Sequence, residues 1–141
     1  MMKNVTANIT QLLRNQFPAE TFYFETVEDT ALQSTPPDRC TKVMSTGGPS
    51  QPWTRYTTAS LQILNRDISK PGAAKQAKDI FNFLHGRFGL DLPAALNVGG
   101  VDYDALKAAQ IKAVQLPYCL GEDDAGRTSF TTNYQVIYEE I

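Results

Sequence analysis

Apolar side chains recur at helical spacing near the start of the chain and predict a helix over about residues 4–16. The residues of this apolar stripe are Val5, Ile9, Leu12 and Leu13. A side-chain oxygen of Asn4 or Thr6 can cap the first turn. The proline at position 18 disfavours helical backbone at Phe17, so we expect the helix to end there.

A second helix is predicted from Ser69 to about His85. A serine can cap its start, and Pro71 removes no helical hydrogen bond because it lies in the first turn. Its apolar stripe consists of Ala73, Ala77, Ile80, Phe81 and Leu84. Phe81 lies in the middle of this stripe and is expected to fill the core beneath a sheet. Gly86 can adopt the left-handed conformation that ends a helix.

Alternating or β-branched and aromatic segments predict the strands. They cover residues 21–27, 39–45, 53–65, 110–116 and 128–138. In the third, Ala59, Leu61 and Ile63 alternate with polar residues, so one face is expected to be buried and the other polar. The last segment alternates most regularly.

Glycine, proline and acidic residues predict the connections. Residues 46–52 hold two glycines and two prolines and suit a loop, and residues 121–126 suit an acidic turn. Between the second helix and residue 110, a short strand is expected near residues 95–98. Residues 102–107 suit either one helical turn or an irregular excursion, and the pattern leaves both possibilities open.

The order of these elements, α, β, β, β, α, β, β, indicates an α+β fold with a mainly antiparallel β-sheet and both α-helices packed on one face. The 141 residues suit one domain, which we expect to span residues 1–141. The helices and strands are expected to share one core.

Charge and hydropathy narrow the possible partners. The chain has thirteen Lys and Arg and fifteen Asp and Glu, which gives a formal net charge of -2. No segment concentrates enough basic residues to bind a row of phosphates, so direct nucleic-acid recognition is not expected. Apolar runs such as residues 80–84 are far shorter than the roughly 20 residues of a membrane span, and residues 1–15 lack a signal-peptide apolar run. We therefore expect a cytosolic protein without a membrane partner. Cys40 and Cys119 are expected to be free thiols.

The sequence contains no motif of a known catalytic mechanism. The one histidine, His85, stands at a helix end, where we expect it to meet the last helical carbonyls. No GxSxG, HExxH, GxGxxG or phosphate-binding loop is present. These observations predict a protein that is not an enzyme and has no cofactor and no metal.

The acidic turn of Glu122, Asp123 and Asp124, which follows Gly121, is the most concentrated charge in the chain. Three readings are open: a hard-cation site, a solvated turn, or a contact with a subunit or partner. Three adjacent carboxylates cannot all face one ion, so the metal reading, and with it a metal-dependent enzyme, is the weakest. Arg127 can fold back onto Asp123 or Asp124, or can pair with a carboxylate across an interface.

The aromatic residues of the strands are expected to be core: Phe22, Phe24, Tyr56, Phe130, Tyr134 and Tyr138. Trp53 differs because it stands beside the glycine- and proline-rich loop. We expect it to anchor an interface.

Two segments carry a resemblance to a known family. LPYCLGEDDAGRTSFTTNYQVIY, Leu116 to Tyr138, resembles the end of the tail terminator and minor capsid proteins of long-tailed bacteriophages. The matching residues are Pro117, Gly121, Glu122 to Asp124, Gly126, Arg127, Phe130 and Asn133. The segment from Ser60 to Gly86 is similar to that family's strand, arginine and alanine-rich helix. This chain has three acidic residues where the family pattern has a pair.

The resemblance implies a small α+β protein that assembles as a homo-oligomer, usually a hexameric ring. Such a ring would sit on the phage tail tube protein, end tube polymerisation and present a surface to the head-tail connector protein. It also implies host cytoplasm during assembly and then the virion tail as the location. On this reading Trp53, Gly121, Glu122, Asp123, Asp124 and Arg127 belong to a subunit or partner interface. The alternatives are a head-completion or connector protein and a non-enzymatic peptide-binding or scaffolding module.

Overall fold

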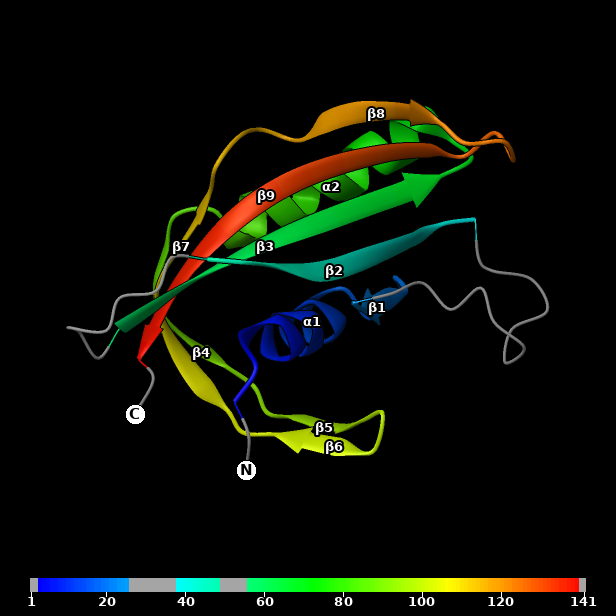
Figure 1. Cartoon of the computed structure of the whole chain (residues 1–141). Coiled ribbons are helices and arrows are strands. Elements are labelled where there is room, and N and C mark those ends of the chain that lie inside the picture. Colours follow the sequence, from blue (N-terminus) through cyan, green and yellow to red (C-terminus); the bar gives the residue numbers. More distant parts are fainter. Residues whose placement is uncertain (1–2, 26–37, 49–55, 140–141) are drawn as a thin grey trace.

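The computed structural model describes residues 3–25, 38–48 and 56–139 (Figure 1). In chain order the elements are α1 (Val5–Gln16), β1 (Phe22–Phe24), β2 (Cys40–Gly47), β3 (Tyr56–Asp67), α2 (Lys70–Leu84), β4 (Arg87–Leu92), β5 (Ala95–Val98), β6 (Val101–Tyr103), β7 (Leu106–Ala113), β8 (Tyr118–Glu122) and β9 (Thr128–Glu139).

Within these residues the large sheet has seven strands, in the order β1-β2-β3-β9-β7-β4, with β8 also paired to β9. Every pair is antiparallel except β1 with β2. At its centre the twelve-residue strands β3 and β9 pair along their whole length. The α+β class with a mainly antiparallel sheet is therefore confirmed.

The structure confirms a predicted cap at the start of each helix and the predicted glycine after α2. Asn4 caps α1 by accepting a hydrogen bond from the Ala7 backbone amide at 3.2 Å, so Asn4 rather than Thr6 is the cap. Ser69 caps α2 by accepting from the Gly72 amide at 3.1 Å. After α2, Gly86 has a φ of +81°, the left-handed conformation that glycine adopts without strain.

One hydrophobic cluster unites the helices with alternate residues of the sheet. Ile9 and Leu13 of α1 and Ile80 and Leu84 of α2 are at most 1% exposed. The cluster also contains Val43, Leu61, Ile63, Ile111, Tyr134 and Val136 from four neighbouring strands. The burial alternates along β3 from Leu61 and along β9 from Thr132 to Val136, as their patterns predicted. It breaks at Phe130, which was expected to be core but is only partly buried, and at Thr131, which is buried on the opposite face.

The prediction that Phe81 fills the core is wrong. Its ring is only half-buried, stacks on the His85 imidazole with centroids 4.9 Å apart, and lies under the Lys78 ammonium. Phe81 is on the flank of α2, while Phe83, on the other flank, packs against the core and the ring of Phe17. The ring of Tyr56, also expected to be buried, is 39% exposed.

Residues 87–113 contain more strand than their pattern predicted. β4 was not expected, and β7 begins at Leu106 and ends at Ala113 instead of covering 110–116. The short strand at 95–98 is confirmed as β5. It pairs with β6 in a small separate sheet, so residues 102–107 form neither a helical turn nor an irregular segment.

We call residues 93–105 the arm, because they leave the large sheet between β4 and β7 and project beyond α1 (Figure 1). The fully buried amide of Asn8, in α1, holds both ends of the arm. Its Nδ2 donates to the backbone oxygens of Pro93, at 2.7 Å, and Asp104, at 3.0 Å. A ring contact between Tyr103 and Phe24 adds to this attachment.

Candidate functional site

The β8–β9 hairpin carries the predicted interface residues, and the Asp123 carboxylate organises its turn. Its Oδ1 accepts hydrogen bonds from the Ala125 amide at 2.9 Å and the Arg127 amide at 3.0 Å. The backbone groups of Asp123 also bond to Arg127 and Gly126. These hydrogen bonds, first of all the one from the Arg127 amide, lower the pKa of the Asp123 carboxyl group.

Arg127 folds back onto its own turn, which is one of the two arrangements that the sequence left open. Its Nε donates to Asp123 Oδ2 at 2.8 Å, and its side chain is only 16% exposed. Two backbone bonds and this ion pair engage both oxygens of the Asp123 carboxylate. The pair therefore maintains the shape of the turn.

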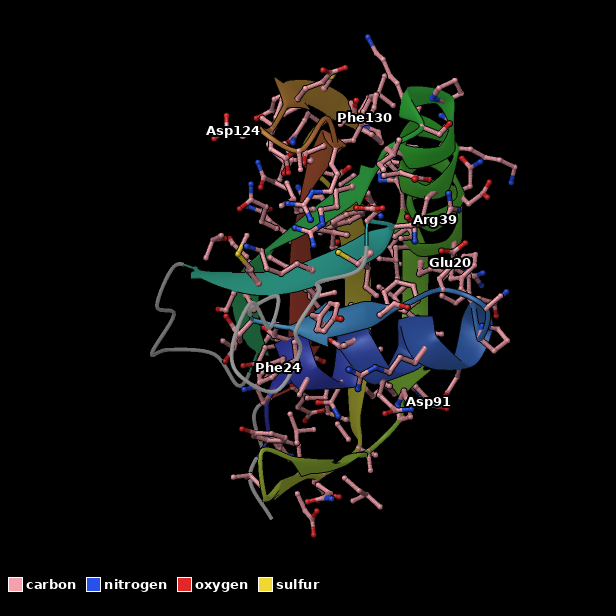
Figure 2. All side chains as sticks on the ribbon, turned by 90° about the vertical axis from the view of Figure 1, so that its right-hand side faces the viewer. Glu20, Phe24, Arg39, Asp91, Asp124 and Phe130 are labelled. Carbon is pink, nitrogen blue, oxygen red and sulfur yellow. The ribbon has the colours of Figure 1, made fainter. Side chains whose placement is uncertain are left out.

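Glu122 and Asp124 are the outward-facing acids of the hairpin. Both are exposed, and the described part of the chain provides neither side chain with a hydrogen bond or an ion pair. Figure 2 shows Asp124 at the edge of the molecule, on the side away from α2. Gly121, with a φ of +107°, lies at a bulge in the pairing of β8 with β9 just before these acids. Trp53 lies outside the described residues.

An exposed apolar edge precedes the acidic turn, and the sequence analysis missed it. We use the name apolar edge for Val114, Leu116, Tyr118 and Leu120, whose exposed fractions run from 48 to 62%. All five residues of β8 are exposed. The alternation of apolar residues from 114 to 120 was the available signal, but Pro117 made it read as the end of one strand.

The apolar edge lies mainly on the face of the sheet that α2 does not cover. Tyr118 pairs with Thr131, and Lys112, just before the edge, pairs with Gln135. Paired residues share a face, and Thr131 and Gln135 alternate with the core residue Tyr134. On this face the Gln62 side-chain amide donates to the Thr131 hydroxyl at 2.8 Å.

His85 has a structural contact, but with a different partner from the one predicted. Its Nδ1 accepts a hydrogen bond from the Ala113 amide of β7 at 2.9 Å instead of meeting a helical carbonyl. The neighbouring amide of Gly86 donates to the Ile111 oxygen, so both residues tie the end of α2 to β7. The side chain that does meet a helical carbonyl is Arg87, whose Nε donates to the Phe83 oxygen at 2.8 Å.

A polar network at the other end of α2 was also missed by sequence reasoning. The Arg39 guanidinium makes two 2.8 Å hydrogen bonds to the Glu20 carboxylate and one of 2.7 Å to Asp67 Oδ2 (Figure 2). The Gln76 amide of α2 donates to the same Glu20 carboxylate at 3.1 Å. The bonds to Glu20 raise the pKa of Arg39 above its ordinary value. These residues are far apart in sequence, so no local pattern predicts that they meet.

An open pocket of about 430 Å³ lies where the first turn of α1 meets β2 and β3. Its lining includes Lys3, Thr6, Ser45, Thr58 and Tyr138. These side chains offer hydrogen-bonding groups and one positive charge.

Two further observations concern metal ions and membranes. Among the described residues, no group of three His, Cys, Asp or Glu side chains is placed to hold a metal ion. The described helices include none that is both long and apolar enough to cross a membrane.

No model of a known protein family matches the chain, and no curated protein matches it either.

Proposed function

We propose that this protein is a structural component of phage assembly that caps the tail tube, ends its polymerisation and offers the surface for head-tail joining. On this proposal it is not an enzyme and works without a cofactor. It forms a ring of identical subunits, in contact with the tail tube protein on one side and the head-tail connector protein on the other.

One observation carries the proposal: the segment that resembles the tail terminators folds as a single hairpin, β8 with β9, whose turn carries exposed acids. The pair of Asp123 and Arg127 holds the turn internally. Glu122 and Asp124 are left to face outward, and the apolar edge leads up to them. Protein–protein contacts combine apolar side chains with charged ones. The apolar side chains contribute affinity, and the charges align the two partners and speed their association.

The structure changes which residues test this role best. The sequence analysis placed Arg127 in the interface, but Arg127→Glu would place a second carboxylate against Asp123 inside the turn. Glu122→Lys and Asp124→Lys reverse the outward charges without touching an internal bond. Surface changes of this kind alter stability by about 0.5 kcal/mol or less, so folding should be preserved.

The experiment is a tail-assembly assay with wild type, a complete deletion and the double variant Glu122→Lys/Asp124→Lys. We expect overlong or headless tails from the deletion. The double variant should give the same defect in part, and more strongly at low salt, where a charge reversal is least screened. Asp79→Lys on α2, which breaks only the exposed pair with Lys75, is the control for a charge reversal away from the hairpin. Normal tails from the deletion would contradict the proposed function, whereas normal tails from the double variant alone would remove only these two acids from the contact.

A further inference from the structure

Among the apolar side chains that the molecule exposes, two sets lie at opposite ends. One set is the apolar edge. The other is on the arm, where the Leu96 side chain is 62% exposed and Val101 is 37% exposed. Leu96 follows Ala95, which is buried against the body of the molecule, so the alternation of the strand directs Leu96 away from it. Both figures place the arm and β8 at opposite ends of the molecule.

The arm and one end of the apolar edge carry complementary charges. The arm holds Asp102 and Asp104 and no lysine or arginine. Lys112, just before the apolar edge, is exposed and shares the sheet face of Tyr118, and the described residues provide it with no ion pair. Glu122 and Asp124 follow the other end of the edge. The acidic, apolar arm therefore matches the Lys112 end of the apolar edge.

The arm is fixed in place before any contact forms. Asn8 binds the backbone at both ends of the arm, and the Asp102 carboxylate accepts from the Asn97 amide at 2.7 Å within it. A preorganised segment loses less conformational entropy on binding than a flexible one. Leu96 is thus presented to a partner on a rigid support.

We propose that the arm of one subunit docks on the apolar edge of a second copy of the same chain, with Leu96 against Leu116 and Tyr118 and the arm's aspartates near Lys112. The two surfaces differ and lie at opposite ends, so the contact is head-to-tail. Such contacts build closed rings when the rotation between neighbours closes. This contact rests on the proposed ring function, because it names the surfaces that would join the subunits.

A mixing experiment tests the head-to-tail arrangement without tail tubes. Leu96→Asp disables the arm and Leu116→Asp disables the edge, and both positions are exposed enough for the variants to fold. In sedimentation velocity we expect wild type to associate and each variant alone to stay monomeric. The mixture should form a one-to-one dimer that does not grow, because only one matching pair of surfaces survives. Association of each variant at the wild-type level, or a monomeric mixture beside an associating wild type, would overturn the proposal.

If wild type is monomeric in sedimentation, cross-linking at high concentration can still detect a weak contact between chains. Cys119 is exposed in β8, whereas Cys40 is buried. Val101→Cys therefore places a second reactive thiol on the arm. At about 1 mM chain, where even contacts with a millimolar Kd are populated, a short bis-maleimide should give a ladder of oligomers. Lys75→Cys, on the outer side of α2, is the control. A ladder no stronger than that of the control would overturn the proposal.

The two proposals can fail separately. A one-to-one dimer of the variants, with normal tails from the deletion, would keep the contact and reject the tail-capping function. Defective tails from the deletion, with no dimer and no ladder, would keep the function and reject this contact. Lys112→Glu should weaken association several-fold at low salt, and Lys75→Glu should not.

Discussion

Arg39 and Glu20 face each other through two hydrogen bonds of 2.8 Å, and this pair joins the turn after α1 to the start of β2. The same guanidinium reaches Asp67 at the end of β3. Three segments that are distant in sequence therefore meet at one side chain. The arrangement lies beside the N-terminal turn of α2, so it also helps to place that helix on the sheet.

Arg39→Ala should destabilise the protein by about 2 kcal/mol, because it leaves two partly buried carboxylates without their donor. Lys75→Ala is the matched control, since its pair with Asp79 is an exposed helix pair worth about 0.3–0.5 kcal/mol. Urea denaturation at neutral pH measures both. Equal losses would show that the Arg39 network contributes no more than an ordinary surface pair.

Asn8→Ala should loosen the arm more than the rest of the molecule. The change removes both side-chain bonds to the arm and leaves the Pro93 and Asp104 carbonyls without that donor, which costs about 1–3 kcal/mol. Hydrogen exchange should accelerate in β5 and β6 while β3 and β9 stay protected. Gln11→Ala removes an exposed side-chain hydrogen bond, to Asn15, in the same helix and is the control. Uniform acceleration over the whole chain would contradict a local attachment.

Ile80→Ala should cost about 2–5 kcal/mol, because its side chain is 1% exposed and its removal leaves a cavity. Phe81→Ala should cost about 1 kcal/mol despite the larger deletion, because the Phe81 ring contacts mainly His85 and Lys78. Chemical denaturation of the two variants orders them. A larger loss for Phe81 would restore the sequence-based view that this ring belongs to the core.

The stability of the protein should fall at low pH in part because Asp123 becomes protonated. Its pKa is lowered in the folded protein, so the turn gains stability above the ordinary aspartate pKa, about 3.9, and loses it as the pH falls through the folded value. In an NMR titration, Arg127→Gln should move the midpoint only part of the way back, since the Arg127 backbone amide remains. An unchanged midpoint would mean that the guanidinium adds nothing to the effect.

Alkaline titration should reveal Tyr134, whose burial raises the pKa of its phenol well above the ordinary value of about 10. Its contribution to stability is complete below that ordinary value and is lost as the pH rises toward the folded value. We expect the Tyr134 phenol to stay un-ionised until the protein unfolds. Ultraviolet titration of wild type and Tyr134→Phe checks this, and identical curves would contradict it.

Local patterns predicted the features that local forces determine. The caps at Asn4 and Ser69, the helix end at Gly86 and the alternation of β3 and β9 all follow from neighbouring residues. The acidic turn of the β8–β9 hairpin was also predicted. Its internal pairing required the structure, because a sequence cannot distinguish an arginine that folds back from one that reaches outward.

The missed features depend on partners distant in the chain. β4 reads as irregular because Gly89 and a mostly exposed surface hide its pairing with β7. β8 was hidden by Pro117, since β7 and β8 pair with successive parts of β9 and the proline lies in the break between them. Arg39, Glu20 and Asp67 meet only after the sheet has formed. Such relationships leave little trace in hydropathy or spacing.

The pairing of β3 with β9 also has a consequence for how the chain is synthesised. Residues 68–127 separate the two strands, so β3 leaves the ribosome well before its main partner exists. At about 5–20 residues per second, this delay is on the order of several seconds. During that time Leu61 and Ile63 lack the strand that completes the sheet around them. Nascent chains should therefore be most prone to aggregation, and most in need of chaperones, in the interval before β9 emerges.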